Sequence, residues 1–196
     1  MTDTSFYFVR HAESEANAAR IYAGHSDSPL TERGREQART VARALAPIHF
    51  DRIVSSDLSR TRDTAEIIAA GRGVTVETFT GLREIDLGQM AGRGWDEARG
   101  LPNYDADGFV QWPGGESLEQ VLGRALGVID VLARESPGKA ILVVGHGGAT
   151  RILVSHFFGV LPKLIRLTAQ NTNITKVIYD GAGYRVESLF DDQHVI

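Results

Sequence analysis

Two histidines follow two short apolar segments that lie near opposite ends of the chain. Residues 5–9 and 140–144 are apolar or nearly so throughout, a pattern typical of parallel strands that are buried on both faces of a sheet. His11 follows the first segment and His146 the second, each where a strand should end and a helix begin. The carboxyl ends of parallel strands meet at one edge of a sheet, and ligands bind at that edge. We therefore expect the two imidazoles to share a site.

Alternation of apolar strands and amphipathic segments along the rest of the chain predicts the fold class. Further strands are predicted at residues 52–54, 74–76, 174–179 and 184–189, the last two as a late hairpin. Helices are predicted at residues 31–46, 57–70 and 117–133. Thr31 and Asp57 are the expected N-caps of the first two helices. This order favours an α/β fold, a three-layer α/β/α sandwich with a mainly parallel central sheet.

The length of 196 residues fits one compact domain. Residues 1–196 are therefore predicted to form a single domain. The segment 88–115 differs from the rest, because it is rich in Gly and Asp, contains both tryptophans and has little periodicity. Long irregular segments often cover binding sites, so we expect an irregular insertion over the active site here.

The composition excludes several classes of protein. The absence of cysteine rules out disulfides, thiolate zinc sites and cysteine nucleophiles. A net charge of -4 disfavours nucleic acid as a partner, since such surfaces need surplus positive charge. No apolar run approaches the length of a membrane span, and the N-terminus lacks the pattern of a signal peptide. We expect a cytoplasmic protein without nucleic-acid or membrane partners, and ligand spacing predicts no metal site.

The residue types beside the two histidines are suited to phosphate. A neutral imidazole can attack phosphorus, and the guanidinium fork of Arg10, next to His11, matches phosphate oxygens. Arg60 stands in the first turn of a predicted helix, where its charge opposes the helix dipole and so hints at an anion; Arg62 is expected in solvent. The glycines around His146 permit close backbone approach, and a protonated His146 would donate to a phosphoryl oxygen.

Five motifs together resemble the histidine phosphatase superfamily, in its phosphoglycerate mutase-like branch (branch 1). They occur in the order and approximate spacing of that family and are Arg10-His11-Ala12-Glu13-Ser14, Asn17, Arg60, Glu84 and Gly145-His146-Gly147. The resemblance covers nearly the whole chain and implies a phosphoglycerate mutase-like fold.

The resemblance also implies a role for each site residue. His11 is the expected phosphorylated nucleophile, and Glu84 the expected proton donor to the leaving oxygen and then the base that activates water. The remaining residues are expected to form the phosphate pocket: Arg10, Asn17, Gly24, Arg60, His146 and Gly147. Arg10, Arg60 and His146 are also expected to assist catalysis. Spacing alone leaves a second interpretation of Glu84 open, as a surface carboxylate that pairs with Arg83.

The resemblance leaves hydrolase and mutase activities to be distinguished. A mutase needs extra cations to hold a second acidic group, but the matching positions here are Leu87 and Trp95, and residues 100–123 contain no Lys or Arg. Gly148 replaces a mutase-type asparagine, and Ala23 replaces a usual threonine. These departures favour a metal-independent phosphomonoester hydrolase of the histidine acid phosphatase type, without a cofactor, acting on a small phosphorylated metabolite.

Two other functions remain open at this point, a cofactor-dependent phosphoglycerate mutase and a non-catalytic module that binds a phospho-ligand. The expected partner in every case is a small-molecule phosphate compound, a phosphate monoester for the hydrolase. His25 is a candidate substrate contact because it follows Gly24 at the expected rim. The late hairpin offers an edge through which a homodimer is possible.

Overall fold

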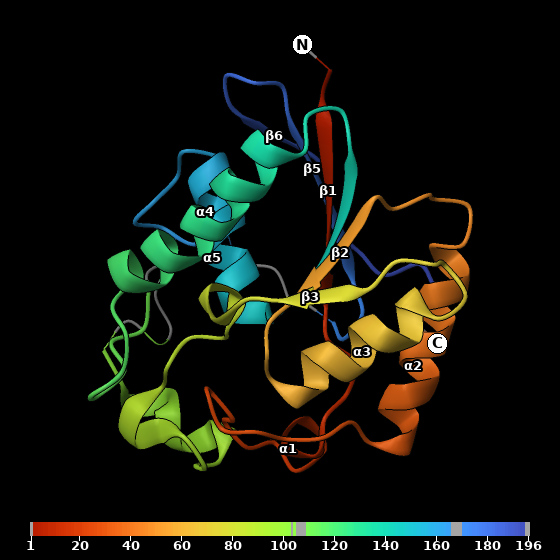
Figure 1. Cartoon of the computed structure of the whole chain (residues 1–196). Coiled ribbons are helices and arrows are strands. Elements are labelled where there is room, and N and C mark those ends of the chain that lie inside the picture. Colours follow the sequence, from red (N-terminus) through yellow and green to blue (C-terminus); the bar gives the residue numbers. More distant parts are fainter. Residues whose placement is uncertain (1, 103, 105–108, 166–169, 195–196) are drawn as a thin grey trace.

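A six-stranded mixed sheet forms the centre of the structure (Figure 1), a computed structural model. The strand order is β3-β2-β4-β1-β5-β6. The β3–β2, β2–β4 and β4–β1 pairs are parallel, whereas β5 and β6 run antiparallel to their neighbours. The structure describes residues 2–102, 104, 109–165 and 170–194. The mainly parallel part of the sheet matches the predicted fold class.

The elements follow the predicted order with small shifts at their ends. The strands are β1 (Thr4–Arg10), β2 (Arg52–Ser55), β3 (Val76–Thr78), β4 (Ala140–Gly145), β5 (Ile174–Tyr179) and β6 (Tyr184–Asp191). The α-helices are α1 (Glu15–Ala18), α2 (Glu32–Ala44), α3 (Ser59–Ala69), α4 (Leu118–Glu135) and α5 (Gly147–Phe157). Short 3₁₀ helices are η1 (Thr80–Leu82), η2 (Gly88–Met90) and η3 (Trp95–Gly100). The edge strand expected at 74–76 is thus shifted to β3.

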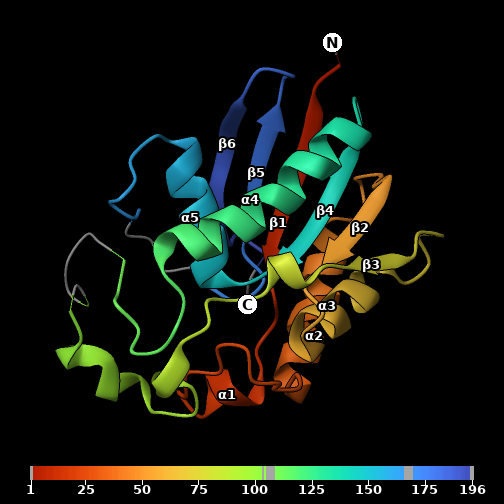
Figure 2. The same ribbon diagram turned by 60° about the vertical axis from the view of Figure 1, so that its left-hand side comes forward.

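Helices cover both faces of the sheet (Figures 1 and 2). Successive side chains of a strand point to opposite faces, and β4 shows this directly. Ile141 and Val143 pack with residues of α4 and α5 on one face, whereas Leu142 and Val144 pack with residues of α2 and α3 on the other. The continuous apolar character of this strand is explained by burial on both sides. The three-layer prediction is confirmed.

The pairing of β1 with β4 brings the two histidines together. Arg10 lies opposite Gly145 in the parallel register, and the backbone N–H of His11 donates to the carbonyl of Gly145 at 2.9 Å. His11 and His146 are therefore the next residues on two adjacent strands at their carboxyl ends. The prediction of a shared sheet edge is confirmed.

The predicted caps were right at α2 and wrong at α3. Thr31 accepts a hydrogen bond from the backbone of Gly34 at 2.9 Å, as an N-cap should. The N-cap of α3 is Leu58, without a side-chain hydrogen bond, rather than Asp57. The carboxylate of Asp57 instead accepts from Nε of Arg83 at 2.8 Å. Because the Arg83 guanidinium binds both oxygens of this carboxylate, a tertiary contact overrides the local signal.

The described part of segment 88–115 runs beside the loop that follows α1. The Tyr22 N–H donates to the Arg93 carbonyl at 2.8 Å, and the Trp95 N–H donates to the Arg20 carbonyl at 2.9 Å. Residues 103 and 105–108 of the predicted insertion lie outside the described residues. Among the helices in the described ranges, none combines the length and apolarity needed to cross a membrane.

Candidate active site

The rings of His11 and His146 lie side by side at the sheet edge. Their centroids are 5.2 Å apart and the planes are inclined at 63°. Both side chains are buried, with 4% and 0% of their surface exposed. Two imidazoles from opposite ends of the chain thus form one buried pair.

A cavity of about 190 Å³ opens beside His11. Six of its lining residues are site residues expected from the sequence: Arg10, His11, Asn17, Gly24, Arg60 and Glu84. The other lining residues are Ser14, Ile21, Tyr22, Ala23, Leu87 and Trp95. The lining therefore combines the charged and polar site residues with mostly apolar side chains. Trp95 places the start of the predicted insertion against this cavity.

The hydrogen bond of His11 fixes its tautomer. Nδ1 lies 2.7 Å from the carbonyl oxygen of Ala12, and because a carbonyl only accepts, Nδ1 carries the hydrogen. Nε2 then has the free lone pair. Burial lowers the pKa of His11 well below its ordinary value of 6.5, and the charges of Arg10 and Arg60 lower it further, against an opposing contribution from the Ala12 bond. At neutral pH the ring is a neutral nucleophile.

His146 is fully buried beside His11. No hydrogen-bond partner for either ring nitrogen lies among the residues that the structure describes. Burial lowers its pKa well below 6.5, with further lowering by Arg60 and His11. The expectation of a protonated His146 therefore does not hold for the free protein, although a neutral ring still donates one N–H. An unsatisfied buried group costs about 1–3 kcal/mol, which a phosphate oxygen beside it would offset.

Arg60 lies at the start of α3, as predicted. It is buried, with only 2% of the residue's surface exposed. Nη1 donates to the Ser26 carbonyl at 3.0 Å and Nη2 to the Gly24 carbonyl at 2.7 Å. Burial lowers the pKa of Arg60, while the charges of Glu84 and Asp27 raise it. Gly24 thus contributes to the cavity by holding this guanidinium, and an anion beside it would balance the buried charge.

The amide of Asn17 is oriented by Asn171, a residue that no sequence pattern predicted. Its Oδ1 accepts from the Ser14 backbone N–H at 3.3 Å and from Nδ2 of Asn171 at 3.2 Å. The amide nitrogen of Asn17 therefore points away from these two donors. Nδ2 of Asn171 also donates to the His11 carbonyl at 2.9 Å. Asn171 precedes β5 in a segment without a motif, so only the fold could reveal its place.

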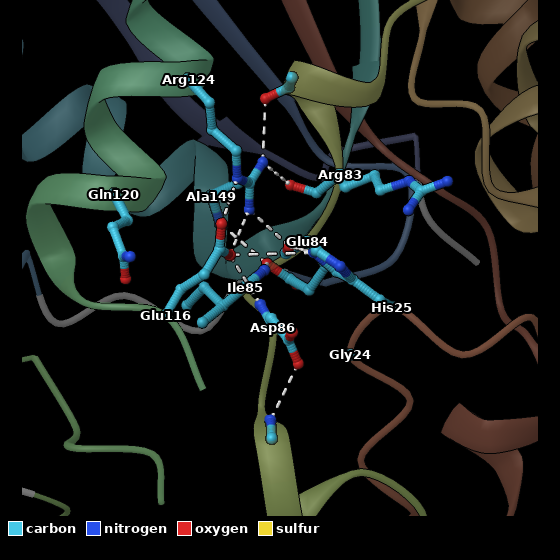
Figure 3. A network of polar contacts seen from close by, with 12 residues as sticks. Gly24, His25, Arg83, Glu84, Ile85, Asp86, Glu116, Gln120, Arg124 and Ala149 are labelled. Atoms are coloured by element: carbon cyan, nitrogen blue, oxygen red, sulfur yellow. Dashed lines mark hydrogen bonds and ion pairs between the residues drawn. The ribbon is translucent and has the colours of Figure 1, made fainter. Parts of the chain in front are cut away.

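The carboxylate of Glu84 sits on the N-terminus of α5 (Figure 3). Oε1 accepts from the Ala149 N–H at 2.9 Å and from the Ile85 N–H at 3.0 Å, and Oε2 accepts from the Gly148 N–H at 3.1 Å. The alternative interpretation as a surface partner of Arg83 is wrong, because Arg83 pairs with Asp57. Glu84 lies instead on the cavity wall.

The structure places the other candidates as follows. His25 does not line the cavity but donates from Nε2 to the Glu84 carbonyl at 2.7 Å (Figure 3). Gly147 begins α5 directly after His146. Arg62 is exposed beside Asp63, as expected. Within the described residues, no group of three or more His, Cys, Asp or Glu could hold a metal ion.

Comparison with known proteins shows the family to which the chain belongs. Residues 6–192 match the sequence model of the histidine phosphatase superfamily (branch 1). A protein named "Probable phosphoglycerate mutase GpmB", from Cronobacter sakazakii (strain ATCC BAA-894), is 39% identical over 206 residues, covering 96% of this chain and 94% of that protein. The structure of Bacillus stearothermophilus YhfR is 28% identical with a TM-score of 0.88, covering 98% of this chain and 100% of that chain. The structure of an Entamoeba histolytica phosphoserine phosphatase in complex with 3-phosphoglyceric acid is 27% identical with a TM-score of 0.87, over 98% and 100% of the two chains.

Proposed function

Because the chain belongs to branch 1 of the histidine phosphatase superfamily, we propose that it hydrolyses phosphate monoesters through a covalent phosphohistidine. The observation that carries this proposal is the convergence of His11, Arg10 and Arg60 on one small cavity that also contacts Glu84. His146 packs against His11 at the same edge. These groups supply a nucleophile, positive charge and a proton-transfer carboxyl group within one site.

In the first step, Nε2 of His11 attacks phosphorus and the bond from phosphorus to the leaving oxygen breaks. The guanidinium groups of Arg10 and Arg60 balance the charge of the phosphoryl oxygens, assisted by an N–H of His146 and the amide of Asn17. Glu84, as a carboxylic acid, gives its proton to the leaving oxygen, which departs as an alcohol.

In the second step, water attacks the phosphorus of phosphohistidine. The Glu84 carboxylate accepts a proton from this water, and the bond from nitrogen to phosphorus breaks. Inorganic phosphate is released and the free His11 side chain is regenerated. The enzyme returns to its starting protonation state. No step uses a metal ion or an organic cofactor, since side chains supply the positive charge.

The apolar part of the cavity favours a hydrolase over a mutase. Apart from the expected site residues and Ser14, the described lining consists of Ile21, Tyr22, Ala23, Leu87 and Trp95. A mutase must hold a second acidic group, and none of these side chains can neutralise one. We therefore infer a small leaving group that is uncharged or partly apolar.

Phosphoglycerate mutase activity is the second candidate, because a relative of similar length carries that name. Product analysis with 3-phosphoglycerate separates the two activities. Release of inorganic phosphate supports the hydrolase, whereas 2-phosphoglycerate as the main product would overturn it. Tight phosphate binding without turnover on any ester would instead indicate a binding module.

A panel of sugar, aryl and alkyl phosphates and bisphosphates then tests the nature of the leaving group. A marked preference for bisphosphates would contradict an uncharged or partly apolar leaving group.

A further inference from the structure

The proton-transfer carboxylate stands on a segment without regular structure. Residues 83–87 lie between η1 and η2 and belong to no helix or strand. Backbone hydrogen bonds of a helix or a sheet therefore do not fix the position of Glu84, and other groups must satisfy its backbone polar atoms. The side chains that do so place the backbone from which the carboxylate extends.

Arg124 of α4 donates to three backbone carbonyls in or just before this segment (Figure 3). Nη1 donates to the carbonyls of Gly81 at 2.9 Å and Arg83 at 2.7 Å, and Nη2 donates to the carbonyl of Glu84 itself at 2.6 Å. Nε and Nη2 also donate to the two carboxylate oxygens of Glu116, at 2.7 and 2.8 Å. The five N–H groups of one guanidinium are thus matched by five acceptors. Two are carbonyls of this segment, one is the carbonyl of Gly81 in η1, and two are the carboxylate oxygens of Glu116.

Glu116 holds the backbone on the C-terminal side of Glu84. Its Oε2 accepts from the backbone N–H of Asp86 at 2.8 Å and lies 3.8 Å from Nε2 of His25. Burial raises the pKa of Glu116, but the hydrogen bonds from Arg124 and Asp86 outweigh it, so that the pKa is lowered overall. The group remains a carboxylate and keeps its partners. The pair formed by Arg124 and Glu116 therefore holds the chain on both sides of the catalytic position.

The two ends of Glu84 are held by different elements. Arg124 and His25 hold its backbone carbonyl, whereas the start of α5 holds its carboxylate. The side chain thus spans from α4 to the residues that follow His146. A shift of the backbone by a fraction of the side chain's length would move the carboxyl group away from the leaving oxygen.

We propose that Arg124, together with Glu116, is a positioning residue that places Glu84 for proton transfer to the leaving oxygen. This inference rests on the proposed function, because it assumes that Glu84 is the acid. Loss of these hydrogen bonds should then slow hydrolysis most for substrates whose leaving group must receive a proton. Esters with poor, alkyl leaving groups need one, whereas dinitrophenyl esters do not.

The experiment compares kcat/KM for an alkyl phosphate and for 2,4-dinitrophenyl phosphate in the wild type, Glu84→Gln and Arg124→Gln. The ratio kcat/KM reports the first step alone, so the later role of Glu84 as a base does not enter it. Arg124→Gln is expected to lose about 10- to 100-fold on the alkyl ester, as misplaced catalytic groups do, and less than about threefold on the dinitrophenyl ester. In a Glu84→Gln background the same change should add no further selective loss.

Arg72→Gln is the matched control. Arg72 also donates to three backbone carbonyls, those of Ala42, Ile48 and Ile68, but it lies over Phe50 away from the site. Its replacement should affect both esters equally. If Arg124→Gln also reduces both equally, the positioning role is wrong and the residue serves stability alone. If Arg124→Gln does not fold, Glu116→Gln is the second variant. It leaves one acceptor oxygen for the donors that two carboxylate oxygens bind now, so it should show the same selectivity to a smaller degree, and an equal effect on both esters would again overturn the proposal.

The design separates this inference from the proposed function. If Glu84→Gln shows no greater loss on the alkyl ester, Glu84 is not the acid and the proposed mechanism fails. If Glu84→Gln is selective but Arg124→Gln and Glu116→Gln are not, the mechanism stands and only the positioning role fails.

Discussion

The carboxylate of Glu84 lies against Gly148 so closely that a β-carbon at position 148 would be 2.6 Å from Oε1. The same hypothetical atom would be 2.7 Å from Cδ1 of Ile85. Gly148 does not have a positive φ, so its backbone conformation does not require glycine. The lack of a side chain instead allows the close approach of Glu84. The turn after His146 is thereby shaped to receive Glu84.

Gly148→Ala should separate activity from stability. The added methyl group displaces Glu84, so we expect kcat/KM on alkyl phosphates to fall by about 10- to 100-fold. Alanine favours the helix by about 1 kcal/mol over glycine, which offsets the local strain, so the free energy of unfolding should change little. Gly127→Ala in α4 is the control, since a β-carbon there meets nothing within 4 Å. It should stabilise slightly and leave activity unchanged, and full activity in Gly148→Ala would refute the close approach.

Gly34→Ala should instead damage stability. Gly34 is buried in the first turn of α2, and a β-carbon there would overlap the backbone carbonyl of Glu13. Because that atom belongs to the backbone, the helix or the segment after His11 must shift, at a cost of about 1–3 kcal/mol. Urea unfolding measures the change, with Gly123→Ala in open space on α4 as the comparison. Equal stabilities for the two variants would show that α2 is not packed this tightly.

The buried histidines predict a pH-dependent stability. Burial lowers the pKa of His146 in the folded state, whereas the unfolded chain titrates near about 6.5. The unfolded state therefore binds more protons below that pH, and stability is lost as pH falls, by up to about 1.4 kcal/mol per pH unit. His146→Gln should flatten the dependence of the unfolding free energy between about pH 7 and 5. His49→Gln, at an exposed position, should leave it unchanged, and equal slopes for wild type and His146→Gln would contradict the burial of a neutral ring.

Asn171→Ala should weaken phosphate binding through its effect on Asn17, since Asn171 itself does not line the cavity. The change removes the donor to Oδ1 of Asn17 and to the His11 carbonyl, so the Asn17 amide loses its orientation. A net hydrogen bond contributes about 1 kcal/mol, and we expect inhibition by inorganic phosphate to weaken about five- to tenfold. The double variant with Asn17→Ala should lose little more than either single one, because the two side chains act as a unit. Additive losses would mean that Asn171 acts independently.

Local patterns in the sequence were sufficient for the sheet and its edge. The apolar runs of β1 and β4 predicted burial on both faces, and parallel strands then bring His11 and His146 together. The cap at Asp57 failed because a distant guanidinium, that of Arg83, binds the carboxylate. The roles of Arg124 and Asn171 could not be predicted from the sequence for a related reason. Both act on backbone carbonyls of segments remote in sequence, and a carbonyl has no residue type that a sequence pattern could reveal.

The central claim is tested most directly by trapping the intermediate. The enzyme is mixed with a ³²P-labelled phosphate monoester, quenched with base within milliseconds and digested. We predict label on the peptide that contains His11, stable in base and lost in acid, and no label in His11→Ala. Turnover of the same ester with no acid-labile label, or undiminished turnover by His11→Ala, would contradict the mechanism.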